Sequence, residues 1–190
     1  MKGIVFNWLE EIVTAEFDSD LWDELLVQAG SDGIYASFGS YPDVEVIQLV
    51  QATANRLAKT EAETWRWLGR RAAPLMAIHY PMVFAVANTL RDLLLDLDLE
   101  MMNMAEVFPE FTVCEGDNET VLVGYRSSIN LCGLIEGLTL GAAEYFGDAI
   151  EIDRLKCANQ EDDTCLYRVR FLNSDNEPLD VDDSKFVLFL

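Results

Sequence analysis

Apolar residues in the first half of the chain recur every three or four positions, which is the period of an α-helix. The apolar stripe that contains Ile4, Trp8 and Ile12 predicts a helix over residues 3–15. The same spacing predicts three further helices, over residues 20–29, 44–58 and 61–72. The loop GSDGIYASFGSYPD, rich in glycine and serine, separates the second helix from the third.

Individual residues mark where these helices begin and end. Gly30 is a typical helix terminator, and Asp43 is suited to cap the third helix. Thr60 and Glu63 have the spacing of a capping box at the start of the fourth helix. These signals agree with the boundaries that the apolar spacing predicts.

A long helix is predicted from about residue 83 to residue 106, after the helix-breaking Pro81. Its end contains the sequence LDLEMMNMAEVFPEF, in which three methionines fall within four positions. Met101 and Met104 continue the apolar stripe, so core packing is the first interpretation of this cluster. Methionine sulfur is also a soft ligand for copper or heme iron.

Beyond Pro109 the pattern changes to β-branched and alternating residues. Strands are predicted over 119–125, 149–153 and 165–172, and a helix over 129–146, whose three glycines indicate close packing against a neighbour. The final KFVLFL is suited to form a last strand. The sequence therefore predicts an α+β fold. Its helical part covers about residues 1–108, its α+β part about 109–172, and an acidic tail 173–190.

The chain is strongly acidic, with 13 basic against 34 acidic residues and a net charge of −21. Such a surface repels nucleic acid and anionic membranes, so we expect neither as a partner. The uncharged stretch 72–90 contains Pro74, Pro81 and His79, which favours a buried helix over a membrane span. With no secretory signal and only four cysteines, we expect a cytoplasmic protein with reduced thiols.

The residues give little support for catalysis. His79 is the only histidine, and its position beside a helix-breaking proline favours a structural or exposed role. The sequence contains no nucleophile elbow, no Walker loop and no glycine-rich dinucleotide motif. We therefore expect that the protein is not an enzyme.

Taken in order along the chain, several segments resemble the heme–nitric oxide/oxygen-binding family, called H-NOX or HNOB. The similar segments are MKGIVFNWLEEIV, GIYASFGSYPD, WRWLGRRAAPLMAIHYP and YRSSINLCGLIEGLTLGAAEYFG, followed by a hairpin with two cysteines. The resemblance covers residues 1 to about 172. It implies a helical subdomain packed on a subdomain of antiparallel sheet plus helices, with a buried pocket between them that holds heme in the family.

The chain departs from this family at the residues that hold the heme. The resemblance places Met101 where the family has its iron-binding histidine. Tyr125 and Ser127 match the Tyr-x-Ser-x-Arg motif that grips the heme propionates, but Ile129 replaces its arginine. Cys114 falls where the family has a proline that presses on the heme plane.

The hairpin cysteines, Cys157 and Cys165, raise the question of a zinc site. Zinc usually takes about four protein ligands, so two cysteines alone favour a structural role or a zinc remnant. In family members with a C-terminal zinc, histidines join the two cysteines. The resemblance places Tyr145 and Arg154 at those positions.

We therefore expect a stand-alone sensor or ligand-binding domain that does not bind heme through histidine. Losing the imidazole and the arginine removes the attachments of the iron and of the heme carboxylates. The remaining apolar pocket suits a hydrophobic small molecule such as a fatty acid or a quinone. Its expected lining consists of Ile4, Trp8, Met101, Met104, Cys114, Tyr125, Ser127 and Leu134.

Two alternatives remain open. The domain could be a heme-based nitric oxide/oxygen sensor whose iron ligand is Met101 or Cys114. It could instead be an interaction module whose pocket is filled by methionine. In each case the resemblance implies regulation in trans of a histidine kinase or a cyclic-dinucleotide signalling enzyme, and the acidic surface suits a basic docking patch.

Overall fold

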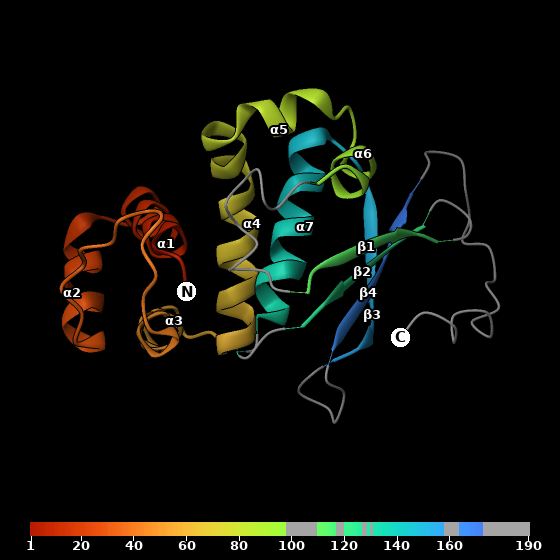
Figure 1. The fold of residues 1–190 in the computed structure, drawn as a ribbon. Helices are drawn as coiled ribbons and strands as arrows, with labels where there is room; N and C mark the ends of the chain where they lie inside the picture. Colours follow the sequence, from red (N-terminus) through yellow and green to blue (C-terminus); the bar gives the residue numbers. More distant parts are fainter. Residues whose placement is uncertain (98–109, 117–119, 127–128, 130, 158–163, 173–190) are drawn as a thin grey trace.

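The computed structural model describes residues 1–97, 110–116, 120–126, 129, 131–157 and 164–172. Within these ranges, three helices form one group: α1 (Gly3–Glu16), α2 (Ser19–Ala29) and α3 (Asp43–Leu57). Helix α4 (Glu61–His79) lies between this group and α7 (Cys132–Phe146), and the sheet covers the other side of α7 (Figure 1). The short helices α5 (Pro81–Val86) and α6 (Leu90–Leu95) cross over the ends of α4 and α7.

Most predicted helix boundaries in the first half are confirmed. Helix α2 ends at Gly30, which has the left-handed backbone conformation (φ 67°) that glycine adopts without strain. Helix α4 begins with the expected capping box of Thr60 and Glu63. The predicted cap of α3 is wrong, because Pro42 is the capping residue. The Asp43 carboxylate instead accepts a hydrogen bond from the amino group of Met1 at 2.7 Å.

Helix α4 is longer than the predicted 61–72, because it continues through Pro74 to His79. Proline removes the N–H that would bond the carbonyl of Arg70 one turn earlier. That carbonyl lies against α7 instead, where a Cβ placed on Gly141 would be only 2.3 Å from it. Met76 and Ala77 are buried beyond the proline, so packing of the extended helix offsets the missing hydrogen bond.

The prediction of one continuous helix over 83–106 is wrong for the first part of that range. The chain forms α5, passes through the extended Ala87, and begins α6 with a capping box of Thr89 and Asp92. Asp148, just after α7, also accepts a hydrogen bond from the Leu90 N–H at 2.6 Å. These caps start a new helix where the apolar period suggested a continuous one. Residues 98–109, with Met101 and Met104, lie outside the described residues.

The sheet contains β1 (Thr112–Glu115), β2 (Thr120–Tyr125), β3 (Ile150–Lys156) and β4 (Cys165–Phe171) in the order β1-β2-β4-β3. All neighbouring strands are antiparallel, and the predicted α+β class is confirmed. Strand β1 was not predicted, since it has four mostly exposed residues and no clear alternation. The expected last strand, over 185–190, lies outside the described residues.

Helices α4 and α7 approach each other unusually closely, as the three glycines of α7 predicted. A Cβ placed on Gly133, Gly137 or Gly141 would lie 2.1–2.5 Å from a backbone carbonyl oxygen of α4. Gly69 of α4 meets the backbone of α7 in the same way, with a distance of 2.3 Å. The two backbones therefore touch directly, and α4 and α7 form the central joint between the helical group and the sheet.

Candidate functional site

The predicted pocket residues that the structure describes lie in one continuous apolar core, except for Cys114. Ile4 and Trp8 come from α1, Tyr125 from the end of β2, and Leu134 from α7, and all four are buried. Cys114 is exposed on the edge strand β1, so it does not line a buried pocket. Met101, Met104 and Ser127 lie outside the described residues, so their part in the predicted pocket stays a prediction.

Trp8 contributes a buried polar atom to this core. Its side chain is 1% exposed, and among the described residues no hydrogen-bond partner lies near its indole Nε1. The neighbouring residues of α1 that face inward, such as Val5, Leu9 and Ile12, are all apolar. A buried N–H without an acceptor costs about 1–3 kcal/mol, so a bound molecule with an acceptor atom would stabilise this site.

The only histidine does not lie in the core. His79 is the last residue of α4, and its side chain is 47% exposed. Its Nε2 lies 3.8 Å from the carboxylate of Glu11 on the surface of α1. The described residues therefore do not fit a heme that is ligated by histidine.

The position of the arginine in the family motif is occupied by Ile129. Ile129 is half-buried and packs against the core between β2 and α7. The nearest basic residue in the sequence, Arg126, is exposed and pairs with Glu110 at 3.3 Å. An apolar side chain at position 129 favours an apolar ligand over a carboxylate at this end of the core.

Three buried cysteines lie close together at the start of α7, the end of β3 and the start of β4. Cys132 is the first residue of α7, Cys157 follows β3, and Cys165 is the first residue of β4. The sulfur atoms all lie within 4.8 Å of one another. Cys132 and Cys165 form a disulfide, and the Cys157 sulfur is 4.0 Å from that of Cys132. Reduced thiols were expected throughout, and this pair corrects that expectation.

The zinc positions inferred from the family need a matching correction. Arg154 does lie beside the cysteines, but Tyr145 lies thirteen residues along α7 from Cys132, about 20 Å at 1.5 Å per residue. It is exposed there and packs against Phe84. The third sulfur comes from Cys132, and no fourth histidine, cysteine or carboxylate ligand joins the cluster among the described residues. Three ligands without a fourth fit a structural zinc poorly.

A small polar network lies over the cysteines. The Glu136 carboxylate of α7 accepts a hydrogen bond from Arg154 at 2.7 Å and forms an ion pair with Arg66 at 3.2 Å. Burial raises the pKa of Tyr167 despite the nearby charge of Arg154. The Tyr167 hydroxyl therefore stays protonated and donates to the backbone carbonyl of Cys132 at 2.9 Å. These contacts link α4, α7 and β3 around the sulfur atoms.

Solved structures share this arrangement of helices and sheet. The crystal structure of an H-NOX protein from S. oneidensis in the Fe(II)NO ligation state is 28% identical, with a TM-score of 0.81. The match covers 91% of this chain and 100% of that chain. The NMR structure of an H-NOX domain from Shewanella oneidensis in the Fe(II)CO ligation state is 27% identical, with a TM-score of 0.80. It covers 91% of this chain and 99% of that chain. The fold is that of the H-NOX proteins.

More distant matches agree on the fold alone. An H-NOX mutant from K. algicida is 21% identical with a TM-score of 0.73, covering 92% of this chain and 98% of that chain.

The family model described as haem-NO-binding, HNOB, matches residues 2–154, and the chain belongs to this family. No curated protein matches the chain. The protein is thus an H-NOX family sensor domain, and no described helix is long and apolar enough to cross a membrane.

Sequence reasoning missed Cys132 as a member of the cysteine cluster. Its position inside an apolar helix gave no local sign of a ligand or a redox partner, because Cys157 and Cys165 are far from it in the sequence. The only available signal was its place at the start of the helix that follows Tyr125. In an antiparallel sheet, the end of β2 and the start of β4 meet, and Tyr125 pairs with Cys165.

Proposed function

We propose that this H-NOX family domain senses a small apolar molecule in a buried pocket, does not bind heme through histidine, and acts without catalysing a reaction. The position of His79 supports this proposal most directly. It is the only histidine of the chain, and it lies on the surface at the end of α4. Ile129 in place of the family's arginine removes a cation that would bind a carboxylate.

The chemistry of the core suggests the class of ligand. The buried residues around Trp8 are apolar, while its indole N–H has no acceptor among the described residues. A molecule with a large apolar body and one acceptor oxygen suits both features. A quinone carbonyl or a fatty-acid carboxyl group would provide such an oxygen.

The proposal is tested by the absorption spectrum of the purified protein, followed by solvent extraction and mass spectrometry. We expect no Soret band and an extracted organic molecule near one equivalent. Trp8→Phe keeps the aromatic ring but removes the N–H, and should weaken retention of that molecule about fivefold or more, by the value of one hydrogen bond. Trp67→Phe is the matched control, since Trp67 is half-exposed and bonds Glu16 instead. If the protein copurifies with no organic molecule and binds neither an added quinone nor an added fatty acid, the proposal is contradicted and a ligand-free interaction module is favoured.

A heme sensor with a methionine ligand is the second candidate. It is favoured by the family itself and by the similar Shewanella domains with iron-bound nitric oxide or carbon monoxide. A histidine-to-glycine mutant of the Shewanella domain in the Fe(II)CO ligation state matches this chain with a TM-score of 0.78. Hemin addition would then produce a Soret band that Met101→Ala removes, whereas Cys114→Ala leaves it unchanged because Cys114 is exposed.

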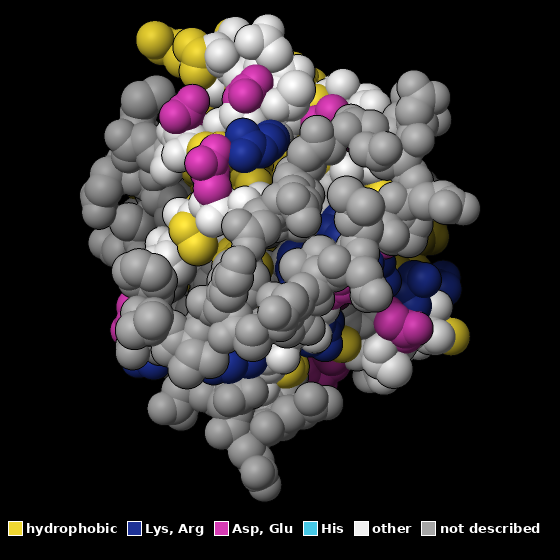
Figure 2. Space-filling model, turned by 90° about the vertical axis from the view of Figure 1, so that its right-hand side faces the viewer, with side chains coloured by type: hydrophobic (Ala, Val, Ile, Leu, Met, Phe, Trp, Pro, Cys, Tyr) yellow, Lys and Arg dark blue, Asp and Glu magenta, His cyan; other side chains and the backbone are white. Residues whose placement is uncertain are grey.

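The proposed signalling partner is a histidine kinase or a cyclic-dinucleotide enzyme that docks through a basic patch. From residue 3 to residue 55 the chain contains ten acidic residues and no lysine or arginine. Asp20, Asp23 and Glu24 are exposed along α2. By contrast, basic and acidic side chains lie side by side on the sheet side of the molecule (Figure 2), where Arg170 pairs with Glu151. The uniform negative charge of α2 makes it the better docking face.

Binding to such a partner should weaken as salt rises, because the contacts are electrostatic. Asp23→Lys should reduce the association rate several-fold at low salt. Asp96→Lys makes the same charge change on an exposed residue after α6 and serves as the control. Equal effects of the two variants, or binding that ignores salt, would argue against docking on α2.

A further inference from the structure

An exposed apolar face lies at one end of the molecule, where α5 crosses the ends of α4 and α7. Ile78, Met82 and Val86 are 71–76% exposed, and Tyr145 is 51% exposed. Met82 and Val86 are four residues apart on α5, so they share one side of that helix. In Figure 2 hydrophobic side chains protrude at the top of the molecule, the height at which α5 lies in Figure 1. We call these four residues the α5 face.

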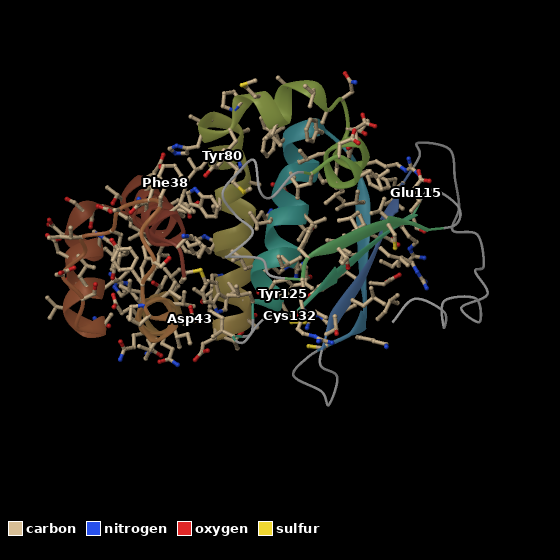
Figure 3. All side chains as sticks on the ribbon, viewed as in Figure 1. Phe38, Asp43, Tyr80, Glu115, Tyr125 and Cys132 are labelled. Carbon is tan, nitrogen blue, oxygen red and sulfur yellow. A yellow bond between two sulfur atoms is a disulfide. The ribbon has the colours of Figure 1, made fainter. Side chains whose placement is uncertain are left out.

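Aromatic packing beneath α5 holds this face in place. Phe84, on the opposite side of the helix, is buried, with its ring stacked on Phe146 and edge-on to Tyr145 at centroid distances of 6.1 and 5.4 Å. Tyr80 joins α4 to α5 at the top of α4 (Figure 3), and its carbonyl accepts a hydrogen bond from the Val83 N–H at 3.0 Å. The inner side of α5 is therefore already filled, and the α5 face can bind an occupant without rearrangement.

The charge of this region points to an apolar occupant. The stretch from residue 72 to residue 90 contains no Asp, Glu, Lys or Arg, although the net charge of the chain is −21. A basic partner is steered to an acidic surface such as α2, and an uncharged face offers it no attraction. Contiguous exposed apolar surface on a protein of this kind marks a binding site for apolar groups.

We propose that the α5 face binds residues 186–190 of the same chain, an inference that does not rest on the proposed ligand. The sequence of this segment, FVLFL, is a run of five large apolar residues. It lies outside the described residues. Binding removes the apolar surfaces of the segment and of the face from water together, and this burial drives the contact. A partner protein that uses the α5 face has to displace the segment first.

The chain leaves the described residues close to this face. The Leu172 N–H donates to the Ala149 carbonyl at 2.8 Å, and Ala149 is four residues after Tyr145. Four residues span at most about 15 Å. Thirteen residues separate Leu172 from Phe186, and a flexible chain of that length has an average end-to-end distance of roughly 20 Å. The length of the connection therefore suits the distance that it has to span.

The size of the face favours this tethered segment over a second copy of the protein. Its four side chains offer an apolar patch on the order of a few hundred Å², whereas a stable interface buries about 800 Å² on each partner. Two copies also repel each other through their net charges of −21. A segment of the same chain is present at an effective concentration of roughly 1 mM, so a small contact is enough to hold it.

Limited proteolysis of the full chain with chymotrypsin, which cleaves after Phe and Leu, tests the proposal. Val86→Lys places a charge in the α5 face and should raise the rate of cleavage within residues 186–190 about tenfold, since cleavage follows the unbound fraction of the segment. Val27→Lys is the matched control, because Val27 is 82% exposed on α2, away from the face, and the cleavage rate should not change. Mass spectrometry identifies the cleaved bonds.

Oxidation of Met82 by hydrogen peroxide gives a second measurement at the face itself. Deleting residues 186–190 should raise the oxidation rate of Met82 several-fold, because the segment no longer covers its sulfur, and the same deletion in Val86→Lys should add little. Both rates should be independent of protein concentration. The proposal is overturned if Val86→Lys and Val27→Lys are cleaved at equal rates, if the deletion leaves Met82 oxidation unchanged, or if protection grows with concentration and light scattering shows a dimer.

Discussion

Replacing Gly137 by alanine tests the close contact between α4 and α7. The new Cβ would lie 2.1 Å from the Arg66 carbonyl oxygen and 2.9 Å from the Arg70 backbone nitrogen. Both atoms belong to the backbone of α4, so neither can rotate away and α7 has to shift. Overpacking of this kind costs about 1–3 kcal/mol, and alanine returns up to about 1 kcal/mol through its higher helix propensity. We expect a net loss of about 1–2 kcal/mol in the free energy of unfolding.

Chemical denaturation followed by far-ultraviolet circular dichroism measures this loss. Thermal unfolding should show a fall in melting temperature of roughly 5 °C for a domain of this size. Gly124→Ala is the matched control. A Cβ there meets only the Thr112 hydroxyl closely, at 2.5 Å, and that side chain is exposed on an edge strand and free to rotate. Its effect should stay within about 0.5 kcal/mol. A Gly137→Ala protein as stable as the unchanged one would refute the direct backbone contact.

Two further predictions concern helix caps. Asp148→Ala removes the acceptor for the Leu90 N–H and should destabilise the protein by about 1 kcal/mol in urea denaturation, whereas Asp148→Asn keeps an acceptor and should lose less; equal losses would contradict the cap. Hydrogen bonds from Thr60 lower the pKa of Glu63 below its ordinary value of 4.5. The stability that the ionised Glu63 carboxylate contributes is therefore fully present above that pH and is lost as the pH falls through the lowered pKa. Stability measured between pH 3 and pH 6 (roughly the range of carboxylate titration) should therefore depend less on pH in Glu63→Gln, and an unchanged acid dependence would count against the capping box.

The sequence was most informative where one local pattern decides the structure. The apolar stripe of α1, the glycine that ends α2 and the capping box of α4 each predicted an element that the structure contains. The glycines of α7 predicted close packing, and their partner helix α4 followed only from the structure. These features depend on residues within one or two helical turns, which is the range that sequence patterns describe.

The errors arise where distant residues decide. Helix α4 passes through Pro74 because α7 packs against it, and Asp148, after the far end of α7, adds a long-range hydrogen bond to the capping box of Thr89 and Asp92 that starts α6. The cysteine cluster joins residues 132, 157 and 165 through sheet pairing. No local pattern contains this information, since each contact depends on how the whole chain folds.

Helix α7 connects the features on which the proposals depend. Its first residue, Cys132, holds the disulfide, its glycine face touches the backbone of α4, and α4 in turn packs against α1, which carries Trp8. Side chains at an ordinary helix interface can change rotamer to absorb a shift, but two backbones in contact leave no such freedom. A displacement of the first turn of α7 must therefore move α4 with it and alter the packing around Trp8. The proposed occupancy of the apolar core would therefore be felt at the first turn of α7 through this joint.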